Sequence, residues 1–174
     1  AGTAQAVSLV AEGQLQLAIV RCTPAQEQAL LPALTEKNLS CEALREDDAL
    51  VLFSARHPLA DARQITAADL APYPALTADD APQPRPAAGR MQIAGRLQQM
   101  EVLSRLSTAY LWSAPESAQS LRRFDLVQRP CADSGLRFRE LLISPAGYQL
   151  SAYDRRFLEL LGKEREQLSR ACGD

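Results

Sequence analysis

Residues 46–74 read EDDALVLFSARHPLADARQITAADLAPYP. The apolar run from Ala49 to Ala55 predicts a buried β-strand, because it is short, unbroken and flanked by charged residues. The HPLA sequence at 57–60 follows the strand directly and predicts a turn. After a short polar spacer, residues 65–70 (ITAADL) predict a helix of about one turn, which Pro72 and Pro74 end.

Strand and helix patterns alternate along the rest of the chain, which favours an α/β fold. The strand LQLAIV at 15–20 becomes nearly all apolar, so we expect it to be covered on both faces and parallel to its neighbours. Capping sequences predict helices at Thr23, Ser113 and Ser151. The proline-rich stretch 78–89 predicts a surface loop. The remaining predicted helices cover 3–12 and 97–106. The remaining predicted strands cover 38–45, which could pair with 48–55, and 90–94, 108–112, 124–129 and 138–144.

The composition limits the classes of protein to which the chain could belong. Its 174 residues are 47% apolar, enough for one domain or two small lobes with a real core. The net charge of −2 gives no electrostatic footprint for nucleic acid or an anionic membrane. No apolar run approaches a transmembrane length, and the first residues lack the basic segment of a signal peptide. Cys22, Cys41, Cys131 and Cys172 are widely spaced and His57 is the only histidine, so we expect free thiols in a reduced, cytoplasmic protein.

Several segments, in order, resemble the effector-binding domain of LysR-type transcriptional regulators. In that family, a strand crosses from one subdomain to the other at an HPLA turn, as 49–60 would here. The upstream run LVAEGQLQLAIV (9–20) is similar to the family's helix–glycine–strand segment. The downstream run MEVLSRLSTAYLWSAPES (100–117) is similar to the family's helix–strand segment, with Arg105, Leu106 and Ser107 in place of glycines. RFDLVQRP, RELLIS and LSAYDRRFLELL resemble its closing stretch, so the likeness covers nearly the whole chain.

The resemblance implies an α/β, two-lobed fold of the type 2 periplasmic-binding-protein kind, with two crossing hinge strands. Lobe one would comprise residues 1–54 plus 146–174, and lobe two residues 55–145. The family's helix-turn-helix, and the first strand and helix of its regulatory domain, would precede residue 3. The expected hinge residues are Ser54, Ala55, Arg56, Ile143 and Ser144.

The fold also implies where a ligand would bind. A small molecule would lie in the cleft between the lobes, near strand ends and helix starts, where free backbone N–H groups favour anions. Arg21 could hold a carboxylate in a forked ion pair, so we expect a small organic anion. The alternatives are structural: a solvated surface arginine, helix caps at Thr23 and Ser113, a turn threonine and a core tryptophan. The candidate ligand-binding residues are Arg21, Cys22, Thr23, Thr77, Ala78, Trp112 and Ser113.

The sequence offers little support for catalysis. His57 could be combined with Ser54 and Asp61 into a hydrolytic triad, but Asp61 lies in the same short turn and no nucleophile elbow is present. We therefore expect His57 to be a turn or hinge residue, and we expect no catalytic residue, no cofactor and no metal site.

The resulting hypothesis is an effector-sensing domain that relays ligand binding to a DNA-binding domain outside this chain. By resemblance, the regulatory domains would associate as a homodimer or tetramer, without contact to a membrane. The main alternative is a solute-binding protein of a transport system, which would share the two-lobed fold. An enzyme on this fold would need paired acid–base groups in the cleft, and the sequence presents none.

Overall fold

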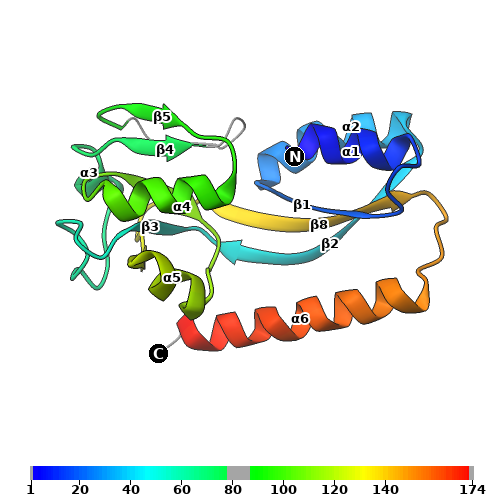
Figure 1. Ribbon diagram of the computed structural model, residues 1–174. Coiled ribbons are helices and arrows are strands. Elements are labelled where there is room, and N and C mark those ends of the chain that lie inside the picture. The colour runs from blue at the N-terminus through cyan, green and yellow to red at the C-terminus, as the bar shows by residue number, and fades with distance from the viewer. Residues whose placement is uncertain (1, 78–86, 173–174) are drawn as a thin grey trace. The chain divides into compact units, whose positions relative to one another are not determined.

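The computed structural model describes residues 2–77 and 87–172, with side chains as far as residue 165. The chain forms two compact units (Figure 1). Unit 1 comprises Ala1–Glu46 and Arg139–Asp174, and unit 2 comprises Asp47–Phe138. The elements in chain order are α1 (Thr3–Ala11), β1 (Ala18–Cys22), α2 (Pro24–Glu36), β2 (Leu39–Asp48), β3 (Leu50–Ser54), α3 (Ala67–Leu70), β4 (Ala75–Thr77), β5 (Arg90–Gln92), α4 (Arg96–Arg105), β6 (Tyr110–Ser113), α5 (Ala118–Phe124), β7 (Leu126–Pro130), β8 (Arg137–Pro145) and α6 (Ala152–Cys172).

Unit 1 is built on a three-stranded sheet in the order β1-β8-β2. Every second residue of β1 (Ala18, Val20 and Cys22) is buried, because these side chains face the helices α1 and α2. Across the sheet, Leu141 and Ile143 of β8 belong to the same apolar cluster. The cluster is completed by Val7, Val10, Leu34 and Leu39.

The prediction that the strand after Gly13 is parallel to its neighbours was wrong. β1 begins three residues later than predicted and runs antiparallel to β8, with Val20 opposite Leu141. Only one face of the strand is fully covered, since Arg21 is exposed. The apolar run LQLAIV was misleading because Leu15 precedes the strand and is 42% exposed.

Unit 2 is built on a five-stranded mixed sheet in the order β5-β4-β6-β3-β7. β3, the predicted buried strand, lies between β6 and β7 and is antiparallel to both. Its residues Val51, Leu52 and Phe53 are fully buried, because both faces of the sheet are covered. Leu52 points to the face covered by α4 and α5, where Met100 and Leu103 pack.

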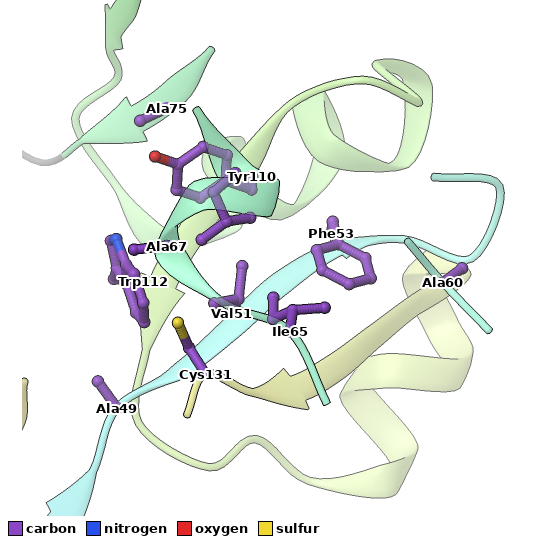
Figure 2. Packing of buried hydrophobic residues seen from close by; sticks show 11 residues of the cluster. Ala49, Val51, Phe53, Ala60, Ile65, Ala67, Ala75, Tyr110, Trp112 and Cys131 are labelled. Atoms are coloured by element: carbon purple, nitrogen blue, oxygen red, sulfur yellow. The ribbon is translucent and has the colours of Figure 1, made fainter. Parts of the chain in front are cut away.

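The segment after β3 covers the opposite face of this sheet. His57 and Ala60 lie in the HPLA turn, where the Ala60 N–H donates to the His57 carbonyl at 2.9 Å. The short helix α3 then begins at a capping box formed by Thr66 and Asp69, which satisfies backbone N–H groups at its start. Figure 2 shows the resulting core, in which Ile65 lies beside Val51 and Phe53 of β3, and Ala67 belongs to the same cluster.

Two predicted capping boxes are confirmed, and one predicted helix cap was wrong. Thr23 with Gln26 begins α2, and Ser151 with Asp154 begins α6. Ser113 instead is the last residue of β6, opposite Leu50 of β3, and α5 is capped by Ser117. The predicted loop 78–89 falls mostly on residues 78–86, outside the described residues.

The chain passes between the units after Glu46 and after Phe138. The predicted lobes change at 54 and at 145, and the structure divides the chain earlier in both cases. The reason is that β3 belongs to the sheet of unit 2, whereas most of β8 belongs to the sheet of unit 1. Consequently Ser54, Ala55 and Arg56 lie within unit 2, and Ile143 and Ser144 lie within unit 1.

Candidate functional site

Three strand ends of unit 2 meet at one edge of its sheet. β4 runs parallel to β5, with Thr77 opposite Gln92, and parallel to β6, with Ala75 opposite Tyr110. Two residues further along β4 and β6, Thr77 reaches the level of Trp112, next to Ser113. The carboxyl ends of parallel strands offer backbone N–H groups to a ligand in α/β proteins. We call this the carboxyl edge of unit 2, defined by Thr77, Gln92 and Ser113.

The start of α4 lies close to the carboxyl edge. Gly95 is its N-cap residue at φ 90°, a left-handed conformation that favours glycine. The chain arrives there directly from β5, and the Ile93 N–H donates to the Thr77 carbonyl at 3.0 Å. The first N–H groups of a helix carry a partial positive charge, so an anion near this edge would be stabilised.

A side-chain network holds the loop after β6 in place. The Gln128 amide on β7 donates to the Ser113 hydroxyl at 2.7 Å and to the Ala114 carbonyl at 3.0 Å. Its carbonyl oxygen accepts from the Glu116 N–H at 2.9 Å. Gln128 therefore holds three of the four residues 113–116 at the carboxyl edge. Sequence reasoning missed it, since an isolated glutamine in a strand carries no recognisable signal.

A second interaction joins this loop to α4. Arg96 donates from Nη2 to Glu116 Oε1 at 2.6 Å, and the side chains are 35% and 18% exposed. Gln99, one turn further along α4, is buried and donates to the Ile93 carbonyl at 2.9 Å. These contacts join the ends of β5 and β6 to the start of α4. Several side-chain interactions therefore hold the carboxyl edge in place.

The predicted residues of the carboxyl edge are brought together, with differing roles. Thr77 is 9% exposed and Ser113 is 4% exposed, so both side chains are largely shielded from water. Trp112 belongs to the core, where its ring meets that of Tyr110 edge-on at 6.4 Å (Figure 2). Ala78 lies outside the described residues.

The predicted residues of unit 1 lie at the end of β1 and directly after it, and each already interacts with other residues of the chain. Arg21 Nη2 contacts Glu140 Oε1 of the neighbouring strand β8 at 2.7 Å. Thr23 caps α2 through its hydroxyl and backbone N–H. Cys22 is buried, and burial, followed by the carboxylate of Glu27, raises the pKa of its thiol to about 11. The Cys22 side chain is therefore a neutral core group and not a reactive thiolate.

His57 is an internal packing residue. It is 3% exposed, its ring stacks on Phe53 with centroids 4.6 Å apart, and Tyr73 meets it edge-on at 4.5 Å. Its Nδ1 accepts a hydrogen bond from the Leu59 N–H at 3.1 Å, so the proton of the neutral ring is on Nε2. Burial lowers the pKa of His57, opposed by a smaller contribution from the Thr108 backbone.

No hydrolytic triad forms around this histidine in the described part of the chain. The Ser54 hydroxyl accepts from the Arg56 N–H at 3.2 Å, and Asp61 is exposed to solvent. Among the described residues, no group of acidic, histidine or cysteine side chains could hold a metal ion. None of the described helices is both long and apolar enough to cross a bilayer.

Comparison with known proteins gives the decisive observation. The family of LysR substrate-binding domains matches residues 1–166. The chain belongs to this family. It is therefore an effector-sensing domain of a LysR-type regulator and not a solute-binding protein of a transporter, and its α/β fold is the two-lobed, periplasmic-binding-protein-like one. No protein with a curated description is similar enough in sequence to count as a match.

Solved structures of LysR-type domains share the fold. The effector-binding domain of QuiR in complex with shikimate is 16% identical, with a TM-score of 0.67, covering 94% of this chain and 79% of that one. The effector-binding domain of BenM with benzoate is 15% identical, with a TM-score of 0.60, covering 93% and 78%. The oxidized form of OxyR is 18% identical, with a TM-score of 0.62, covering 91% and 76%.

Proposed function

We propose that this LysR-type domain senses a small organic anion, and that the carboxyl edge of unit 2 supplies the main contacts to it. The observation that carries the proposal is the convergence of Thr77 and Ser113 beside the start of α4. Two shielded hydroxyl groups and a helix N-terminus would together bind a carboxylate, because the hydroxyl groups and the backbone N–H groups of the helix can all donate hydrogen bonds to its oxygen atoms.

Within unit 1, the segment 21–23 is a second proposed anion-binding position. Arg21 is 41% exposed at its side chain while it holds Glu140, so its outward N–H groups can still donate to an anion. The ligands named for two relatives, shikimate and benzoate, are both small organic acids, which supports the same class here.

Binding would act by favouring one arrangement of the domain over another. A ligand shifts such an equilibrium only by its difference in affinity for the two states. The readout, by this proposal, is a DNA-binding domain outside this chain, in a cytoplasmic dimer or tetramer. Catalysis plays no part in the proposal, since His57 is buried as a neutral packing residue and Ser54 is bonded elsewhere.

A thermal-shift screen tests the proposal directly. The chain is heated with a panel of aromatic and aliphatic carboxylic acids, each paired with its uncharged primary amide. A binding acid should raise the melting temperature with the logarithm of its concentration, and stabilise by about 2.7 kcal/mol at 100 times its Kd. The matching amide should give a much smaller shift.

Matched variants then locate the site. Thr77→Val and Ser113→Ala each remove one hydroxyl and should weaken binding of the acid. Ser104→Ala, near the end of α4 remote from Gly95, should leave it unchanged. Equal affinity in all three variants would refute the proposed edge, and equal shifts by acids and amides would refute the proposed ligand class.

A further inference from the structure

The first residue of α4 brings a positive charge to the carboxyl edge of unit 2. Gly95 is the N-cap residue, so Arg96 begins the helix, and the side chains of a helix lean toward its amino-terminal end. The Arg96 guanidinium reaches Glu116, in the loop that follows β6. Both residues belong to unit 2, so the geometry of the pair is set within one compact unit.

Arg96 uses only one side of its guanidinium to hold Glu116. Its Nε and Nη2 donate to Glu116 Oε1 at 3.1 and 2.6 Å, so the contact is made by the side-on fork. Its Nη1 lies 3.5 Å from Gln99 Oε1, which is a weak hydrogen bond. A guanidinium has five N–H groups. Glu116 takes two of them and Gln99 one, so two have no acceptor among the described residues, and the end-on fork of Nη1 and Nη2 can bind a second group.

Glu116 also has an oxygen that is not used. Both Arg96 donors share Oε1, and Oε2 accepts no hydrogen bond within the part of the chain that the structure describes. Oε2 is not a buried atom, so it is open to solvent. The Glu116 N–H donates to Gln128 at 2.9 Å, which holds this residue in place. The pair therefore offers a donor fork and an acceptor oxygen close to each other.

The charges of the pair restrict which acids can bind to it. A carboxylate on the end-on fork would be attracted by Arg96 and repelled by the neighbouring Glu116. A hydroxyl group beside that carboxylate would donate to Oε2 and so offset the repulsion. A second carboxylate in the same place would meet Glu116 directly. An ammonium group would lie beside the Arg96 charge and the positive end of α4, so a hydroxyl group is favoured.

We propose that Arg96 and Glu116 together determine which acid the domain senses. Arg96 binds the carboxylate through its end-on fork, and Glu116 accepts a hydrogen bond from a hydroxyl group on the adjacent carbon. The effector is accordingly an α-hydroxy acid. This inference rests on the proposed function, because it takes the carboxyl edge of unit 2 as the anion site and adds two residues that contact the ligand.

Three small acids test this selectivity. Acetate carries the carboxylate alone, glycolate adds a hydroxyl group on the adjacent carbon, and malonate adds a second carboxylate there. Each is titrated near neutral pH and at constant ionic strength into the isotope-labelled 174-residue chain, and the NMR shifts of the Arg96 Nε–H and of the Glu116 and Ser113 amides give a Kd. Compared with acetate, glycolate should bind about five-fold more tightly, the effect of one hydrogen bond, and malonate about five-fold more weakly.

Glu116→Gln should reverse the order of the two substituted acids. The glutamine oxygen can still accept from Arg96, but an NH₂ group then donates where Oε2 accepted. Malonate should therefore bind about five-fold more tightly than glycolate in this variant. Glu101→Gln is the matched control, because it removes the same charge from an exposed position on α4 and should keep the original order.

Arg96→Gln should weaken the binding of glycolate and of acetate by about ten-fold, because it removes the charged fork. Arg105→Gln, at the other end of α4 and exposed, is its matched control and should change neither Kd. Circular dichroism melting shows that each variant is folded.

The outcomes separate this inference from the proposed function. If no acid gives a saturable shift at the carboxyl edge, the edge does not bind anions, and both fail. If the acids bind there but glycolate has no advantage over acetate, or Glu116→Gln keeps the original order, or Arg96→Gln binds as tightly as the unsubstituted chain, only the inference about Arg96 and Glu116 fails. Tighter binding of glycine than of glycolate would overturn the assignment of a hydroxyl group.

Discussion

Replacing Gln128 by leucine should loosen the loop at the carboxyl edge of unit 2. Leucine has nearly the same size as glutamine but can make none of the three hydrogen bonds to Ser113, Ala114 and Glu116. A hydrogen bond of this kind contributes about 1 kcal/mol net. Gln128 is half-buried, so water can form some of the lost hydrogen bonds. We therefore expect the free energy of unfolding to fall by about 2 kcal/mol.

The single tryptophan makes this measurement specific to unit 2. Trp112 precedes Ser113 in β6 and is 5% exposed, so its fluorescence reports the unfolding of the sheet to which Gln128 belongs. With a urea dependence of about 2 kcal/mol per molar, the midpoint should fall by roughly 1 M. Binding of an acid found in the thermal-shift screen should weaken in parallel.

Gln119→Leu is the matched control for this substitution. Gln119 lies on α5 in the same unit and is exposed, so its replacement should move the midpoint by much less. If both variants lowered the urea midpoint of the Trp112 transition equally, the hydrogen bonds of Gln128 would not be what stabilises the loop at the carboxyl edge.

Three further predictions concern other parts of the molecule. Burial lowers the pKa of His57 below its ordinary 6.5, so the unfolded chain binds more protons as the pH falls through that value. The contribution of His57 to stability should be constant above about pH 6.5 and decline below it, and an NMR titration that placed the only imidazole at or above 6.5 would contradict this. Glu140→Gln removes the buried carboxylate that Arg21 and Arg165 both contact; because Arg21 is 41% exposed, we expect unit 1 to lose about 1 kcal/mol in a circular dichroism melt, and an unchanged melt would show that the carboxylate is dispensable. Leu52→Ala empties a fully buried position between β3 and α4 and should lower the unfolding free energy by about 3–5 kcal/mol, measured by Trp112 fluorescence; a loss below about 1 kcal/mol would show that the core had collapsed around it.

Features that depend on a few adjacent residues were predictable. The caps at Thr23 and Ser151 were recognised because a hydroxyl and an acceptor three residues later can satisfy the helix start without help from elsewhere. β3 was recognised because an apolar run this short, bounded by charged residues, is more typical of a buried strand than of a helix. The order of such segments also carried the likeness to LysR-type domains, which the family match confirms.

Features that depend on distant partners were not predictable. Ser113 has the sequence of a helix cap, but pairing with Leu50 extends β6 through it. The direction of β1 relative to its neighbour is set by β8, which lies more than a hundred residues away in the chain. Arg21 looked free to bind a ligand, yet Glu140, 119 residues further along, is its partner.

The sequence by itself determined the α/β class, most helices and strands, and membership of the LysR substrate-binding family. It could do so because hydrophobic periodicity and capping are local properties. Only the tertiary structure decided that Thr77 and Ser113 share one sheet edge, that Gln128 fixes the loop beside them, and that β1 runs antiparallel to β8. Each of these depends on which strands pair. Strand pairing involves segments that are distant in the sequence, so no short stretch of sequence is sufficient to predict it.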